Sequence, residues 1–318
     1  MQFPQSRYTL DTPGKINLYF DVLRRLDSGY HEIESVVVPI SLFDTLEVSA
    51  SSELHLDVIF SPESAFYSAQ SLKDFPTGST NLVYRAAQRL REIARSRSGT
   101  LPGARIILTK RIPTESGLGG GSSDAAAALV LLNDLWELGL SRGELSGIGA
   151  DLGCDVPLFL GDFPIVCRSR GEKLEEVAGG ETFPVLHLVV VRPEKGLSTS
   201  EVYRRCHPRS KQENQDAIAD FLGAWRDNRL EDVARRLFNR LVEPALALSP
   251  EMGRVQELFR ELPDPCLGFS MTGSGSAWFG ICRDAEHAAR AASFFEMRQS
   301  GTVFSAHTLR RRINNVEH

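Results

Sequence analysis

Alternating apolar and polar residues predict strands in the first third of the chain. Residues 8–12 and 13–23 form two strand-like stretches, and residues 44–48 and 54–60 alternate with the two-residue period of a sheet that buries one face. A further strand-like run at residues 104–109 precedes a glycine-rich segment. The N-terminal part is therefore predicted to be built on a sheet.

Helical periodicity is concentrated in three segments of the same half. Residues 81–94 are amphipathic, with Thr80 or Asn81 as the expected N-cap. An apolar helix is predicted at residues 124–138, and a shorter helix at residues 141–148. A hairpin is predicted after these helices, from Phe163 to Val177.

The second half follows a different order. Strands, helices and one polar loop are predicted at these residues: strand 185–191, helix 201–206, loop 207–215, helical periodicity over 217–262 with breaks near Pro244 and Pro250, strands 268–271 and 277–281, helix 285–297, and strand 302–309. This order of one strand, helices, two strands, a helix and a strand is typical of a two-layer α+β domain. The fold class predicted for the chain is therefore α+β.

The glycine-rich segment 113–123 carries the strongest chemical signal. Four of its residues lack a Cβ and let the backbone lie against a ligand: Gly117, Gly119, Gly120 and Gly121. Three residues can cap the following helix: Ser122, Ser123 and Asp124. A helix N-terminus behind such a loop binds phosphate. The alternative is a flexible loop that happens to precede a helix. The P-loop pattern does not fit, because no lysine follows the last glycine.

Length and composition narrow the functional classes. The 318 residues suffice for two domains, and 42% hydrophobic with 24% charged residues is ordinary for a globular protein. A net charge of -5 argues against a nucleic-acid partner, and no apolar run is long enough for a membrane span. Five widely spaced cysteines indicate reduced thiols in a cytoplasmic protein, without disulfides or a zinc site.

Three further places carry candidate chemistry. Lys15 and Asn17 stand two apart in an apolar strand and can share a face, although an edge strand with solvated polar residues would look the same. Tyr30 and His31 follow a turn and could hold a flat ring, or could simply pack a hairpin corner. Asp155 precedes an apolar segment and is a candidate acid–base group, with a helix-capping aspartate as the alternative.

Three separated segments resemble the signature motifs of the GHMP small-molecule kinases: residues 13–18, 113–123 and 272–276. Additional segments resemble the branch that phosphorylates a cytidine-diphosphate-linked methylerythritol in non-mevalonate isoprenoid precursor biosynthesis: residues 29–31, 119–124, 151–157 and 198–199. The resemblance runs from about Thr9 to the last strand.

The resemblance implies a two-domain GHMP kinase architecture. Residues 1–180 would form an ATP-binding and catalytic domain like domain 2 of ribosomal protein S5, and residues 181–318 a ferredoxin-like substrate domain. The active site would lie in the cleft between them.

The resemblance also implies roles for individual residues. Lys15 and Asp155 fall on the catalytic lysine and aspartate. The positions that fall on substrate contacts are Asn17, Tyr30, His31, Thr199 and Tyr203, with the two tyrosines sandwiching cytosine. The positions that fall on the ATP site are Asn81 and Lys110 near adenine, and Pro113, Gly117, Leu118, Gly119, Gly120, Gly121, Ser122 and Ser123 in the phosphate loop.

The implied activity is transfer of the γ-phosphate of ATP, with Mg²⁺, to the 2-hydroxyl of a small cytidyl substrate. Another kinase of the superfamily, of homoserine or mevalonate type, is the nearest alternative; a non-catalytic nucleotide sensor and an RNA-binding module are more distant ones. Glu115 departs from the family, which often has a small residue there, and would repel phosphate unless it points away or helps to hold Mg²⁺. No metal ligand is assigned, and the oligomeric state is left open.

Overall fold

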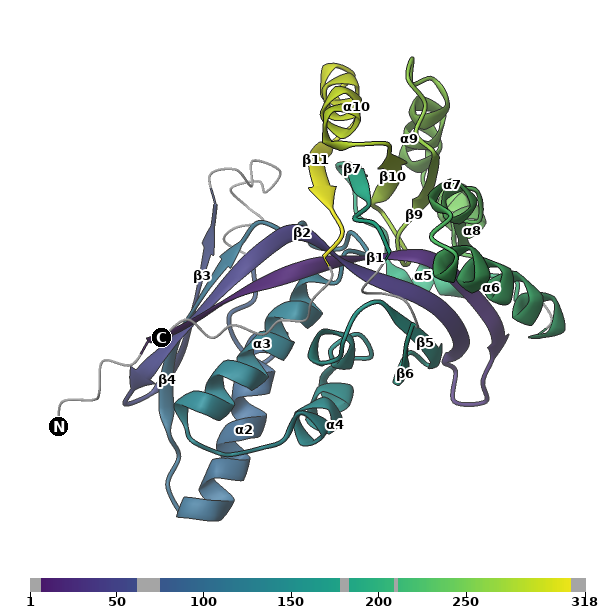
Figure 1. Cartoon of the computed structure of the whole chain (residues 1–318). Helices are drawn as coiled ribbons and strands as arrows, with labels where there is room; N and C mark the ends of the chain where they lie inside the picture. Colours follow the sequence, from purple (N-terminus) through teal and green to yellow (C-terminus); the bar gives the residue numbers. More distant parts are fainter. Residues whose placement is uncertain (1–6, 62–74, 178–182, 209–210, 310–318) are drawn as a thin grey trace.

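The computed structural model describes residues 7–61, 75–177, 183–208 and 211–309. Two sheets organise these residues (Figure 1). The first has the strand order β3-β4-β2-β1-β8, with β5 pairing with β2 and β6 with β5. Its strands are β1 (Arg7–Arg25), β2 (His31–Ser51), β3 (Leu54–Phe60), β4 (Gly103–Lys110), β5 (Ile165–Ser169), β6 (Lys173–Glu176) and β8 (Phe238–Asn239).

The second sheet has the order β11-β7-β10-β9. Its strands are β7 (His187–Arg192), β9 (Gly268–Met271), β10 (Trp278–Cys282) and β11 (Thr302–His307). The described helices are α2 (Leu82–Ser98), α3 (Gly120–Leu135), α4 (Arg142–Leu152), the 3-10 helix η1 (Pro157–Leu160), α5 (Thr199–Arg204), α6 (Lys211–Arg226), α7 (Leu230–Arg235), α8 (Val242–Leu248), α9 (Pro250–Arg260) and α10 (Ala285–Met297). The α+β class predicted from the sequence is confirmed.

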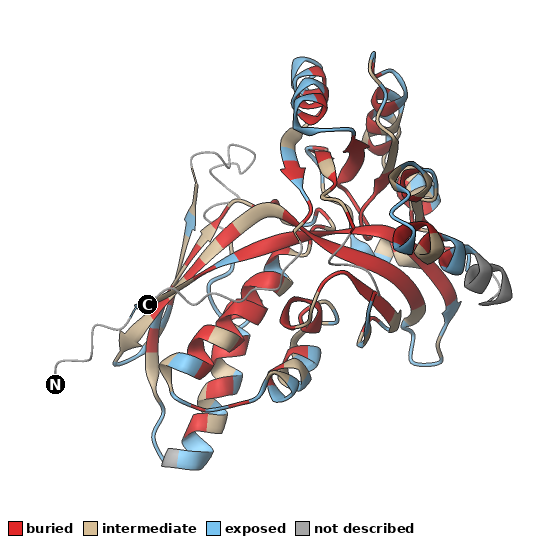
Figure 2. Cartoon of the chain, in the orientation of Figure 1, coloured by how far each residue is buried: buried red, intermediate tan, exposed pale blue. Residues whose placement is uncertain are grey.

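Helix α3 lies against the first sheet because its residues are small and apolar. Residues 125–128 are four consecutive alanines with no exposed surface, so the helix is buried on several sides (Figure 2). Together with α2 and the inner face of the sheet it forms a hydrophobic core, in which burial of apolar surface is the main stabilising term. This core holds the N-terminus of α3 in a fixed place.

The two halves of the chain are joined through the first sheet. Strand β8 comes from the second half and pairs in parallel with β1. The ion pair between Asp21 of β1 and Arg240, 2.7 Å long and largely buried, closes this contact. A second contact lies just after β11, where Thr308 forms an isolated antiparallel β-bridge with Ile40 of β2. The C-terminal half is therefore docked on β1, which carries Lys15 and Asn17, and on the neighbouring strand β2.

Several local predictions are corrected. The stretches at 8–12 and 13–23 form one strand, because an irregularity between Pro13 and Gly14 shifts the register without ending β1. Helix α6 begins at Lys211, inside the segment 207–215 predicted as a loop. None of the described helices is long and apolar enough to cross a membrane.

Candidate active site

The glycine-rich loop lies between β4 and α3, and two of its glycines have the left-handed backbone that glycine favours. Gly117 has φ 75° and Gly119 has φ 74°. A Cβ on Gly117 would lie 2.2 Å from the carbonyl oxygen of Thr272, so no side chain fits there. The loop is thus pressed against the segment 272–276 of the second half.

Helix α3 begins four residues earlier than predicted. Gly119 is its N-cap and no side chain caps the first turn, so the expected capping by Ser122, Ser123 or Asp124 is wrong. The left-handed conformation of Gly119 ends the loop and lets the helix start at once. The first-turn N–H groups are therefore not occupied by a capping side chain and can face an anion.

The next two glycines face opposite surroundings. A Cβ on Gly120 would lie 2.9 Å from the side chain of Ile112 and 3.3 Å from the carboxylate of Asp44, which places it toward the protein interior. A Cβ on Gly121 would meet nothing within 4 Å. Gly121 is therefore the position from which an added side chain would reach the open space before the helix.

A cavity of about 680 Å³ lies in front of this helix. The predicted nucleotide residues that line it are Asn81, Lys110, Pro113, Gly117, Gly119, Gly120, Gly121 and Ser122; Leu118 and Ser123 are buried behind them. Asn81 caps α2, where its Oδ1 accepts the N–H of Val83 at 2.8 Å. Its side chain therefore shapes the cavity wall from a fixed position.

Lys110 belongs to a buried charge network under the loop. Its ammonium contacts Asp44 and lies 2.8 Å from Oδ2 of Asp124, and all three residues are at most 2% exposed. Thr12 donates a hydrogen bond to Asp124 at 2.7 Å. Burial and the nearby Asp44 raise the pKa of Asp124 to about 7, although Lys110 opposes this. Burial lowers the pKa of Lys110, but the two carboxylates together raise it above its ordinary value.

A second cavity of about 940 Å³ adjoins the first. Four residues line both cavities: Glu115, Gly117, Gly119 and Ser122. The second cavity is also lined by all seven residues predicted as catalytic or substrate-binding: Lys15, Asn17, Tyr30, His31, Asp155, Thr199 and Tyr203. Ligands in the two cavities would therefore meet at the glycine-rich loop.

Lys15 and Asn17 share a face of β1, as predicted. The ammonium of Lys15 donates to Oδ1 of Asn17 at 2.8 Å, and the amide of Asn17 donates to the hydroxyl of Ser35 at 2.8 Å. Thr272 donates to the same Asn17 oxygen at 3.1 Å and lies 3.2 Å from the carbonyl oxygen of Gly117. This network fixes the lysine in an interior site, where its side chain is 5% exposed.

Asp155 lies in the turn between α4 and η1. Its Oδ2 is 3.7 Å from the ammonium of Lys15, and its side chain is 44% exposed toward the second cavity. The helix-capping alternative is not supported, because the N-cap of η1 is Val156 and the C-cap of α4 is Gly153. A partly exposed carboxylate beside a buried ammonium can accept a proton from a bound hydroxyl.

An aromatic corner formed by Tyr30, His31 and Tyr203 lines the second cavity. The rings of His31 and Tyr203 have centroids 5.1 Å apart and are tilted by 36°. Tyr30 is 54% exposed, and its ring lies 5.4 Å below the guanidinium of Arg170. Burial, with a smaller effect of Arg25, lowers the pKa of His31, so its neutral form is favoured. Burial raises the pKa of Tyr203, which keeps its hydroxyl protonated.

The segment 272–276 and helix α5 complete the wall from the second half of the chain. Thr199, the first residue of α5, makes a 2.9 Å hydrogen bond with the hydroxyl of Ser274. This contact connects the part of the cavity that is expected to hold the phosphate acceptor with the segment 272–276.

Sequence reasoning missed three features of the site. The Asp44–Lys110–Asp124 network was not anticipated, because the three residues are far apart in sequence. Three arginines line the second cavity without belonging to any motif: Arg25, Arg170 and Arg204. Thr272 was part of a recognised motif, but nothing in the sequence placed it on Asn17.

Models of known families match both halves of the chain. The model described as GHMP kinases N terminal domain matches residues 81–162, which include the glycine-rich loop and Asp155. The model described as GHMP kinases C terminal matches residues 217–298.

Individual relatives cover most of the chain. A 4-diphosphocytidyl-2-C-methyl-D-erythritol kinase of Pelotomaculum thermopropionicum is 40% identical over 88% of this chain and 91% of its own length. An enzyme of the same name from Moorella thermoacetica is 38% identical over 93% of this chain and 97% of its own length.

Solved structures agree with these matches. A crystal structure of 4-(cytidine 5'-diphospho)-2C-methyl-D-erythritol kinase superposes with a TM-score of 0.70 at 33% identity, covering 94% of this chain and 98% of that one. A homoserine kinase from Cytophaga hutchinsonii has a TM-score of 0.71 at 16% identity, covering 100% and 99% of the two chains. The second likeness shows the shared fold alone.

Proposed function

The chain belongs to the 4-diphosphocytidyl-2-C-methyl-D-erythritol kinases of the GHMP superfamily, and we propose how its residues carry out that reaction. The enzyme transfers the γ-phosphate of ATP to the 2-hydroxyl of 4-diphosphocytidyl-2-C-methyl-D-erythritol, a step of the non-mevalonate route to isoprenoid precursors. The observation that carries the mechanism is the Lys15–Asp155 pair, 3.7 Å apart, in the cavity that shares the glycine-rich loop with the nucleotide cavity.

Asp155 would act as the general base. An alcohol is a poor nucleophile at neutral pH, so a carboxylate must take its proton as the bond to the γ-phosphorus forms. The bond from that phosphorus to the β,γ-bridging oxygen breaks and ADP leaves. Lys15, held by Asn17, would favour the ionised form of Asp155 and stabilise negative charge that develops on the transferred group.

The loop and the N-terminus of α3 would hold the β- and γ-phosphates. The N–H groups of the first helical turn have no side-chain cap, and Gly121 leaves the approach open. The cavity wall at Asn81 and Lys110 would surround the base and ribose. Lys110 is held in this wall by the buried carboxylates of Asp44 and Asp124.

The donor set at the junction of the cavities fits Mg²⁺. This ion is usually held by one or two carboxylates together with substrate phosphates and water. Glu115 is exposed and lines both cavities, as does Ser122, and Asp155 lines the second. These residues would hold the ion, which neutralises phosphate charge when bound.

Recognition of the cytidyl group would fall to the aromatic corner. His31, favoured in its neutral form, can both donate and accept a hydrogen bond at the edge of the base. Tyr203 is packed against His31, whereas Tyr30 is exposed. The proposed sandwich of cytosine between Tyr30 and Tyr203 therefore requires Tyr30 to close over the base from the solvent side.

The two parts of the chain would have separate roles. We propose that residues 1–180 form the ATP-binding and catalytic domain and residues 181–318 the ferredoxin-like substrate domain. Thr199 and Tyr203 come from the second of these. A cytoplasmic location is proposed from the cysteine content and spacing.

An acceptor panel tests the function directly. Release of ADP is measured with 4-diphosphocytidyl-2-C-methyl-D-erythritol, homoserine and mevalonate at equal concentrations. Turnover is expected with the cytidyl substrate alone, since homoserine and mevalonate leave the aromatic corner empty. Equal turnover with either small alcohol would contradict the proposal, and loss of activity in Asp155→Asn identifies the measured activity as this enzyme's own.

A further inference from the structure

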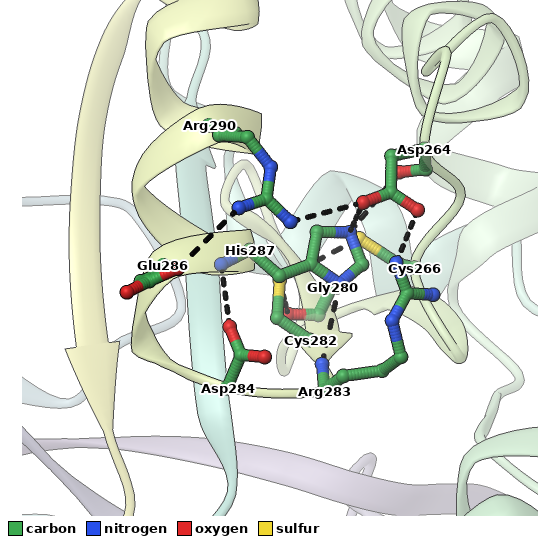
Figure 3. A network of polar contacts seen from close by, with 9 residues as sticks. All are labelled: Asp264, Cys266, Gly280, Cys282, Arg283, Asp284, Glu286, His287 and Arg290. Atoms are coloured by element: carbon green, nitrogen blue, oxygen red, sulfur yellow. Dashed lines mark hydrogen bonds and ion pairs between the residues drawn. The ribbon is translucent and has the colours of Figure 1, made fainter.

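A cluster of soft ligands lies in the C-terminal half, away from both cavities. The sulfurs of Cys266 and Cys282 are 3.9 Å apart, and ligand atoms of these two residues and His287 all lie within 4.8 Å of one another. The three residues come from the loop before β9, the end of β10 and the first turn of α10 (Figure 3). Cys282 and His287 are buried and Cys266 is partly buried. None of them lines either cavity.

The surrounding backbone makes room for this cluster. A Cβ on Gly280 would lie 2.6 Å from the sulfur of Cys266, so only glycine at this place in β10 admits the thiol. The start of α10 is also fixed, because Asp284 accepts the N–H of His287 at 2.7 Å as its N-cap. The positions of Cys266 and His287 are therefore set by the fold.

The hydrogen bonds of His287 suit a metal-bound imidazole. Its Nε2 lies 3.0 Å from the carbonyl oxygen of Asp264, and its Nδ1 lies 3.3 Å from the amide nitrogen of Arg283. A carbonyl can only accept, so Nε2 carries the proton and Nδ1 has the lone pair. Metal-bound histidines are typically oriented in this way, by donating the second N–H to a backbone carbonyl. Coordination by Nδ1 would replace the 3.3 Å contact with the amide.

We propose that Cys266, Cys282 and His287 form a binding site for zinc. Two thiolates on one tetrahedral zinc, each bonded at about 2.3 Å, lie about 3.8 Å apart. The observed separation of 3.9 Å is close to that value, so the sulfurs need little movement. Two thiols with an imidazole favour zinc over magnesium or calcium, which prefer oxygen ligands.

The charge balance is favourable. Binding releases the thiol protons, and two thiolates with a neutral imidazole compensate the two charges of zinc. Arg283 and Arg290 both pair with the carboxylate of Asp264, which directs their charge toward that group.

The fourth position would be filled by water. The carboxylate of Asp264 is not a ligand in this arrangement, because it lies 3.9 Å from Nε2, the protonated nitrogen of His287, and pairs with Arg283 and Arg290. The bound ion would tie the loop before β9 to the end of β10 and the start of α10, and would stabilise this part of the C-terminal sheet. It would take no part in phosphoryl transfer.

The test uses the full-length, chelator-treated protein under a thiol-preserving reductant. Zinc is titrated against a chromophoric chelator, and cobalt is added to a second sample. We expect one equivalent of zinc bound with Kd below about 1 µM, a rise in Tm on zinc addition, and cobalt absorption with the thiolate charge-transfer and tetrahedral bands. The cobalt spectrum of the unaltered protein is informative whether or not the variants fold.

Two variants and a control assign the ligands. Cys266→Ser and Cys282→Ser should each weaken zinc binding more than about 100-fold, since loss of an outer-sphere partner alone costs up to that factor. Cys154→Ser, a thiol outside the cluster, should bind zinc as the unaltered protein does. The proposal is overturned if the folded, reduced protein binds no zinc, or if cobalt binds without thiolate bands. It is also overturned if zinc binding survives Cys266→Ser. A protein in which Cys266 and Cys282 form a disulfide with diamide but bind no zinc when reduced would overturn it as well.

Discussion

Removing the buried cation at Lys110 should destabilise the enzyme strongly and in a pH-dependent way. Lys110→Met keeps the length of the side chain and leaves Asp44 and Asp124 facing each other without the ammonium. At the 2.8 Å separation from Asp124, and an effective dielectric constant near 20, the lost attraction is about 6 kcal/mol before desolvation is counted. Breaking a buried ion pair typically costs about 3–5 kcal/mol net, which is the loss of unfolding free energy expected here.

The pH dependence follows from the pKa of Asp124. In the folded enzyme it is raised to about 7, above the ordinary value, so the contribution of this group to stability is full at low pH and is lost as pH rises toward 7. Lys110 opposes that rise, so its removal moves the folded pKa of Asp124 higher and extends the loss to higher pH. The loss of unfolding free energy in Lys110→Met, relative to the unaltered enzyme, should therefore be larger at pH 8 than at pH 5.5.

Urea unfolding of both proteins at pH 5.5 and 8 measures this effect. The matched double variant Lys110→Met with Asp124→Asn leaves one buried carboxylate, and Asp44 still accepts the N–H groups of Arg111 and Ile112. It should be more stable than Lys110→Met at pH 8, because the uncompensated repulsion is gone. A Lys110→Met enzyme within about 1 kcal/mol of the unaltered one at both pH values would refute the reasoning.

Further predictions concern the active site. Asp155→Asn should lower kcat by about 10²–10⁴ in steady-state assays, with little change in KM for ATP, and Lys15→Met should lower kcat similarly. The double variant should lose much less activity than the product of the two single losses, because the two residues act as a unit. Gly121→Val should weaken ATP binding in calorimetry while the fold is kept; Gly120→Ala should instead cost about 1–3 kcal/mol of stability, because its Cβ meets the interior. Tyr203→Ala should raise KM for the cytidyl substrate about 5- to 150-fold, since stacking contributes about 1–3 kcal/mol; an unchanged KM would remove the residue from the base site.

The glycine-rich loop between β4 and α3 could be predicted from sequence because its signal is local. Strand, glycines and helix follow one another within a short stretch, and each residue type there has a backbone reason. The shared face of Lys15 and Asn17 was predictable for the same reason, since a strand places residues two apart on one side. The pairing of these segments with Asp155 came from the family resemblance.

Tertiary structure decided the features that depend on distant residues. The cap of α3 was mispredicted because the serines and aspartate are good capping types, yet Asp124 is drawn into the interior by Lys110 and Thr12. Propensity describes a residue's local alternatives, and a buried ion pair outweighs them.

The cysteines show the same limit of sequence reasoning. Sequence spacing argued against a metal site, because Cys266 and Cys282 are 16 positions apart and form no short motif. Adjacent antiparallel strands and the helix start that follows bring them together with His287.

The sequence determined which segments could bind phosphate and carry charge. Only the pairing of strands and the docking of the two halves determined which side chains became neighbours, because contact is set by long-range packing that no local pattern records.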